Sequence, residues 1–150
     1  MHRRAALQAG LALCASLAVP SARGCEYFTP TLRITHPWTR AAEVDAPFAV
    51  VSMRFDEVIV ADRLIGAETP LAKGVELVGD MRIPEGRETS LGEEGAHIRL
   101  VGLKEALGVG RAYPLELAFE KGGVVHTRLN VDYLRLNLPF QRLPVPPVSR

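Results

Sequence analysis

Short runs of strand-forming residues, separated by turn residues, constrain the fold of this chain more than any other feature. Their lengths and regular spacing are typical of β-sandwiches and barrels. After residue 25 no run keeps the period of an amphipathic helix. The sequence therefore predicts an all-β, two-sheet antiparallel sandwich without substantial helix. The runs cover residues 32–35, 48–55, 64–65, 75–78, 97–101, 115–119 and 124–131.

Alternation of apolar and polar residues within these runs predicts which side chains enter the core, because successive residues of a strand face opposite sides of the sheet. The clearest hairpin lies between Phe119 and Val124, where Gly122 and Gly123 separate two β runs and can adopt positive φ at little cost. The side chains expected in the core are those of Ile34, Phe48, Val50, Leu64, Leu77, Leu100, Leu117 and Leu129.

The first 24 residues have the pattern of a secretory signal peptide. A start containing two arginines precedes an uncharged apolar run from Ala5 to Pro20, and small residues follow at Ala22 and Gly24. A transmembrane anchor is the weaker interpretation, because the run is shorter than the ~20 apolar residues that span a bilayer. We therefore expect cleavage before Cys25, export, and no transmembrane span in the mature chain.

The cysteines bear on how the exported domain is stabilised and anchored. Cys14 leaves with the signal peptide, so Cys25 is the only remaining thiol and no internal disulfide can form. A cysteine at the cleavage site also raises the possibility of a lipid anchor. Arg23 stands where lipoprotein signals have a small uncharged residue, so ordinary cleavage is favoured. The domain must then rest on its hydrophobic core.

Charge and motifs exclude several classes of function. After residue 24 the chain has 15 basic and 17 acidic residues, so its net charge is −2 and nucleic acid is not an expected partner. The sequence lacks a Gly-x-Ser-x-Gly motif, a phosphate-binding glycine loop and a His-Glu-x-x-His motif. We therefore expect a protein that is not an enzyme.

The last part of the chain differs from the domain before it. We expect the β domain to cover residues 25–133 and a proline-rich extension to cover residues 134–150. Leucines alternate in the first half of the extension, which could add an edge strand, whereas an extended tail is expected beyond Gln141. The prolines that exclude a regular central strand are Pro139, Pro144, Pro146 and Pro147.

Thioether, thiol and imidazole side chains are the donors that suit Cu(I). Several of them have a simpler interpretation: Met53 as a core residue, His126 as a solvated surface residue, and His36 as part of a turn before Pro37. Cys25 could chelate copper together with a free terminal amine, although a chain terminus is a poor place for a fixed site. The candidate donors are Cys25, His36, Met53, Met81, His97 and His126.

A series of short motifs, in order and over most of the mature chain, resembles the PCu(A)C family of periplasmic copper chaperones. No single motif is specific, but their order and spacing together are. The motifs are ITHPWTRA at 34–41, DRLIGA at 62–67, GVEL at 74–77, IPEG at 83–86, HIRLVGLK at 97–104, YPLEL at 113–117 and FEKGG at 119–123.

The resemblance implies a cupredoxin-like Greek-key β-sandwich that binds Cu(I) through His and Met side chains and delivers it to the copper site of cytochrome oxidase. In that family a His follows the Val-Glu-Leu strand, a Met comes later, and a His-x-Met motif ends the set. Here Val78 stands at the first His and Arg99 at the last Met. Only His97 and, in a loose alignment, Met81 carry over.

A guanidinium group cannot ligate metal and repels a cation, so the resemblance implies a degenerate site. We expect weak or absent Cu(I) binding at His97 and Met81, in the periplasm. The expected partner is a cytochrome oxidase copper-site subunit or another copper-handling protein. The alternative is a metal-free β-sandwich adaptor that binds a periplasmic protein partner.

Overall fold

The computed structural model of the protein describes residues 26–131, and no helix occurs among them. The predictions about the signal peptide, Cys25 and the proline-rich extension lie outside these residues. The described strands are β1 Glu26–Phe28, β2 Arg33–Thr39, β3 Ala49–Asp56, β4 Asp62–Glu68, β5 Ala72–Val78, β6 Arg82–Ile83, β7 Thr89–Leu91, β8 His97–Leu103, β9 Ala112–Phe119 and β10 Gly123–Val131.

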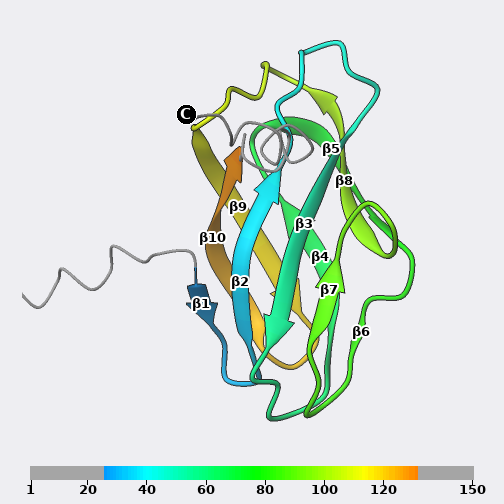
Figure 1. The fold of residues 1–150 in the computed structure, drawn as a ribbon, viewed down its shortest axis with the longest axis vertical. Coiled ribbons are helices and arrows are strands. Elements are labelled where there is room, and N and C mark those ends of the chain that lie inside the picture. The colour runs from blue at the N-terminus through cyan, green and yellow to red at the C-terminus, as the bar shows by residue number, and fades with distance from the viewer. Residues whose placement is uncertain (1–25, 132–150) are drawn as a thin grey trace, which may run out of the picture.

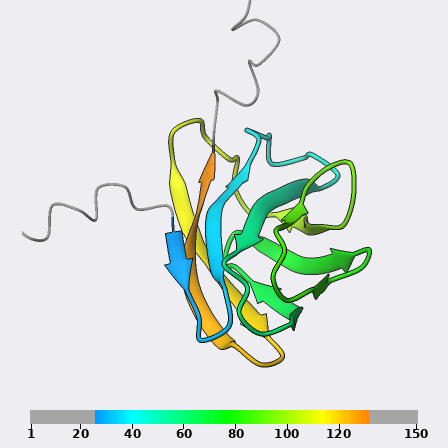
Figure 2. The same ribbon diagram turned by 60° about the horizontal axis from the view of Figure 1, so that its bottom comes forward.

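The strands form one strongly curled sheet in the order β5-β8-β3-β2-β10-β9-β4-β6, with β1 beside β2 and β7 beside β3. Figure 1 shows that the curl places β2 and β3 in front of β4 and β9, and Figure 2 shows the same layers from below. The prediction of an all-β sandwich is therefore confirmed. One detail differs from an entirely antiparallel arrangement: β2 and β10 run parallel where Asn130 pairs with Trp38.

The core lies between the two layers and confirms most of the expected residues. Ile34, Leu64, Leu100, Leu117 and Leu129 are all buried, and Leu77 packs against the core from the edge strand β5.

The prediction was wrong for Phe48 and Val50. The side chain of Phe48 is 40 % exposed, and Val50 is only partly buried. In β3 the alternation places Val51 in the core and the exposed Arg54 on the opposite face, together with Val50. Ser52 and Arg54 alternate with Val51, Met53 and Phe55, so the local pattern already marked the outer face. The prediction gave more weight to the apolar character of Phe48 and Val50 than to this alternation.

A β-bulge in β2 controls which side chains reach the outer face of this layer. Thr35 pairs with Arg54, and Trp38 pairs with Ser52. Between these two pairs, β2 therefore contains one more residue than β3. His36 adopts φ 52° at the bulge, a left-handed conformation that is uncommon outside glycine. The extra residue lets Ile34 and Thr39 both enter the core and turns Trp38 outward.

The predicted hairpin joins β9 and β10, with Phe119 paired to Gly123. A buried carboxylate fixes it to the rest of the domain. Asp62 is 7 % exposed and accepts hydrogen bonds from the backbone amides of Lys121 (2.8 Å) and Gly122 (2.9 Å). A Cβ at Gly122 would lie 3.1 Å from the Asp62 carboxylate and 3.0 Å from the Thr31 hydroxyl, so the close approach requires glycine.

Candidate metal site

His97 begins β8, directly opposite Val78 at the end of β5. The residue is 8 % exposed, and Nδ1 lies 2.9 Å from the carbonyl oxygen of Gly95. Since a carbonyl can only accept, Nδ1 carries a hydrogen, and in the neutral form of the ring Nε2 is the nitrogen with the lone pair. Nε2 is buried and has no hydrogen-bond partner among residues 26–131. A histidine whose second nitrogen donates to a backbone carbonyl has the tautomer and orientation of a metal ligand.

The segment after β5 is packed tightly against the residue before His97. Gly79 has φ +92°, and a Cβ on it would lie 2.9 Å from the Cα of Ala96. Val78, whose position the resemblance assigns to a histidine ligand, contributes only hydrocarbon beside His97. The close contact fixes the path of the chain past His97 but adds no donor there.

Met81 lies three residues after Val78 and immediately before β6. Its side chain is 8 % exposed and belongs to the hydrophobic core, and its carbonyl accepts a hydrogen bond from the amide of Leu64 (3.1 Å). The structure therefore gives Met81 a packing role next to the segment that passes His97. Whether its thioether serves as a second donor stays a proposal.

Arg99 projects from the same face of β8 as His97, because the two residues are two positions apart. Its guanidinium carbon lies 4.3 Å from the centre of the Phe48 ring, and its NH1 group lies 4.0 Å from the carboxylate of Glu76. The Nε of Arg99 is buried without a hydrogen-bond partner among the described residues. This side chain places a permanent positive charge near His97, which disfavours a bound cation.

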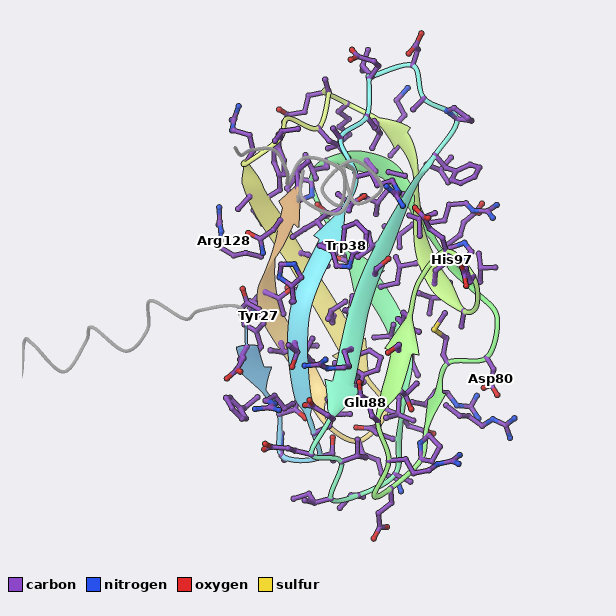
Figure 3. All side chains as sticks on the ribbon, in the orientation of Figure 1. Tyr27, Trp38, Asp80, Glu88, His97 and Arg128 are labelled. Carbon is purple, nitrogen blue, oxygen red and sulfur yellow. The ribbon has the colours of Figure 1, made fainter. Side chains whose placement is uncertain are left out.

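Arg40 and Glu93 form a charged pair near His97 that the sequence analysis did not identify. Arg40 donates to Glu93 through Nε (2.6 Å) and NH2 (3.2 Å), and its guanidinium stands 5.9 Å from the ring centre of Trp38. Hydrogen bonding to Arg40 lowers the pKa of Glu93 against the effect of burial, and the charges of Arg40 and His97 add to the shift. Figure 3 labels Trp38 on β2 and His97 at the start of β8.

The other candidate donors are dispersed. Met53 and His126 lie as their simpler interpretations predict, whereas His36, expected in a turn, lies within β2. Met53 is buried in the core, and His126 is exposed, with Nδ1 3.1 Å from Glu116. His36 occupies the bulge of β2. Within the described part of the chain no three His, Cys, Asp or Glu residues form a metal-binding group.

Comparison with known families and structures places these features in context. A family model described as "Putative lipoprotein LpqE-like" matches residues 32–131. No curated protein matches the sequence. Between residues 26 and 131 no helix has the length and apolarity needed to cross a membrane.

Several solved structures share the fold. The apo PCuAC domain from PmoF1 is 25 % identical, with a TM-score of 0.67, over 71 % of this chain and 98 % of that one. The copper-bound PCuAC domain from PmoF2 is 28 % identical, with a TM-score of 0.64, over 71 % and 97 %. The solution structure of Cu(I)-DR1885 from Deinococcus radiodurans, at 22 % identity, covers 77 % and 85 % with a TM-score of 0.59 and supports the fold alone.

Proposed function

Because this chain belongs to the LpqE-like family, within the copper-chaperone-like PCuAC proteins, we propose that it is an exported protein that handles Cu(I) through a reduced donor set. His97 is the principal donor, and Met81 supplies the second. The ion is cargo that the protein takes up and releases. The low donor number makes binding weak compared with a complete set of histidines and methionines.

One observation carries the proposal: the buried, unpartnered Nε2 of His97. Burying a polar atom without a hydrogen bond costs on the order of 1–3 kcal/mol, so native proteins seldom do it without a reason. The Gly95 carbonyl holds the ring in the tautomer that leaves this lone pair available. A bond to a soft metal ion would satisfy it.

The residues fit Cu(I) in kind but not in number. Imidazole and thioether are donors that Cu(I) prefers. Val78 and Arg99, however, stand at positions where the resemblance implies a histidine and a methionine. The degenerate site is therefore part of the proposal, and it suits a protein from which the ion leaves easily.

We further propose that the protein works in the periplasm and passes Cu(I) to another copper-handling protein, such as the copper-site subunit of cytochrome oxidase. Weak binding favours such a transfer, because a recipient with more donors draws the ion away. The PCuAC relatives and the LpqE-like family support an exported protein.

The test is a Cu(I) titration of the mature protein against a competing chelator, anaerobically, with His97→Ala and His126→Ala compared. His126 is an exposed histidine paired with Glu116, which makes it the matched control. We expect His97→Ala to weaken binding by about tenfold or more, and His126→Ala to leave it unchanged. Tight binding that survives His97→Ala would place the site elsewhere, with Cys25 as the next residue to replace.

A metal-free adaptor is the second candidate, and Arg99 is the observation that favours it. An arginine stacked on the partly exposed Phe48 is the kind of side-chain pair that concentrates binding energy at protein interfaces. The same titration separates the two functions. An adaptor without metal would show no Cu(I) binding above that of His97→Ala.

A further inference from the structure

A second polar region lies around β4, β6 and the β9–β10 hairpin. A cavity of about 460 Å³ opens there, and four basic side chains line it: Arg63, Arg82, Arg87 and Lys121. These are four of the 15 basic residues that follow the signal peptide. Three carboxylates, those of Asp62, Asp80 and Glu120, also line the cavity, so the cations exceed the acids there by one.

Among residues 26–131, one of these four cations forms an ion pair: Arg82 contacts Asp80 through NH2 at 2.9 Å. The charge of Arg63 also acts on the Asp80 carboxylate, without a direct ion pair. Hydrogen bonds from Arg82 lower the pKa of Asp80 to about 2, so this carboxylate is ionised and committed. Among the described residues no carboxylate forms an ion pair with Arg63, Arg87 or Lys121. Figure 3 shows Asp80 at the edge of this region.

The strand register places like charges together. Arg63 of β4 and Arg82 of β6 are direct cross-strand partners. Like charges in directly opposed positions destabilise a sheet. A natural sequence that keeps such a local conflict commonly does so where something binds. The Asp80 carboxylate, which accepts from Arg82 and interacts with the charge of Arg63, relieves part of this repulsion, and an anion in the cavity would relieve more of it.

The buried carboxylate of Asp62 fixes the positions from which two of the cations emerge. It accepts hydrogen bonds from the backbone amides of Arg63 (2.8 Å) and Lys121 (2.8 Å), and from the Thr31 hydroxyl (2.7 Å). The backbone amide of Gly122 also donates to it, so the carboxylate accepts four hydrogen bonds. These bonds hold the backbone at Arg63 and Lys121, and so fix the points from which the two cationic side chains emerge at the cavity.

We propose that this cavity binds a phosphoryl group. The cations come from β4, β6, the segment after β6 and the β9–β10 turn, so they approach from several directions. A tetrahedral, multiply charged anion can accept from all of them, whereas a planar carboxylate offers a single plane. Of the three lining carboxylates, Asp62 and Asp80 already accept hydrogen bonds, and Glu120 opposes the binding of an anion.

The test uses the full mature chain in 150 mM chloride, which suppresses weak nonspecific attraction. Inorganic phosphate is titrated while the side-chain Nε–H signals of Arg63 and Arg87 are followed by NMR. We expect saturable shifts. Arg63→Gln combined with Lys121→Gln should weaken binding by about fivefold or more, judged from the Arg87 signal. The matched control, Lys73→Gln combined with Lys104→Gln, removes the same charge outside the cavity and should change nothing.

A second arm distinguishes free phosphate from a lipid headgroup. Vesicles of phosphatidylglycerol are compared with vesicles of phosphatidylcholine by cosedimentation. Binding to the anionic vesicles that the Arg63 and Lys121 double variant loses identifies the headgroup as the source. Saturable binding of inorganic phosphate without vesicle binding identifies the free ion. The proposal is overturned if neither probe binds saturably, or if the cavity variant and the control variant behave alike.

Discussion

Asp62 and His97 are both buried polar residues, but their hydrogen bonding differs completely. The Asp62 carboxylate accepts from Thr31, Arg63, Lys121 and Gly122 and so joins three segments of the chain. His97 uses one ring nitrogen and leaves the other without a partner among residues 26–131. A buried group with every bond made stabilises the fold, whereas one with an atom left open costs stability and is available for binding.

Replacing Asp62, the residue with every hydrogen bond made, should have the largest effect. Asp62→Ala removes the acceptor of three backbone amides and a hydroxyl, so we expect the free energy of unfolding to fall by about 3–4 kcal/mol. Urea denaturation measures this loss. Glu116→Ala, at an exposed carboxylate paired with His126, is the control and should cost less than ~1 kcal/mol. Equal losses in the two variants would refute a special role for Asp62.

For His97, the corresponding test is to add metal donors beside it. Val78→His combined with Arg99→Met adds an imidazole and a thioether beside His97 and removes a positive charge. We expect Cu(I) affinity to rise by about 100-fold, which corresponds to about 2.7 kcal/mol. Competition with a chelator measures it. Arg99→Gln, which removes the charge without adding a sulfur donor, should give a smaller gain. An unchanged affinity in the double variant would contradict the position proposed for the site.

Acid pH tests the role of Asp62 without removing its side chain, because it protonates the carboxylate. Burial would raise the pKa of Asp62, but hydrogen bonds from Lys121, Thr31, Arg63 and Gly122 outweigh it and lower the pKa. The carboxylate therefore contributes stability in full above the ordinary aspartate pKa of about 3.9, and this contribution is lost as the pH falls towards its folded-state pKa. We expect Asp62→Asn to flatten the decline of unfolding free energy below about pH 5. A decline as steep as that of the wild type would assign the acid sensitivity to other carboxylates.

The smallest effect is expected from His97 itself. His97→Asn keeps a side-chain amide that can donate to the Gly95 carbonyl and removes an atom that makes no hydrogen bond. We expect the apo protein to lose about 1 kcal/mol or less of unfolding free energy. Thermal and urea denaturation of the metal-free protein measure it. A loss as large as that of Asp62→Ala would make His97 a structural residue and weaken its assignment to copper.

The sequence identified the elements of the fold because their signals are local. Alternation within short runs and the glycine pair at Gly122 and Gly123 gave the sandwich and its hairpin. In β3, Ser52 and Arg54 already marked the outer face locally, but the prediction gave more weight to the apolar character of Phe48 and Val50 and placed both in the core. His97 was found by its motif, but the Gly95 carbonyl that orients it depends on the turn before β8.

The amino-acid sequence was enough to predict the all-β class and the side chains that could bind Cu(I). It also showed that His97 remains at a histidine position of the ligand set that the family resemblance implies. Only the tertiary structure decided which buried polar atoms are satisfied. The partners of Asp62 come from segments distant in sequence, and the opposed arginines of β4 and β6 meet only through strand register. Alternation is a property of neighbouring residues, whereas hydrogen bonding and charge pairing depend on distances that exist only once the sheet has curled.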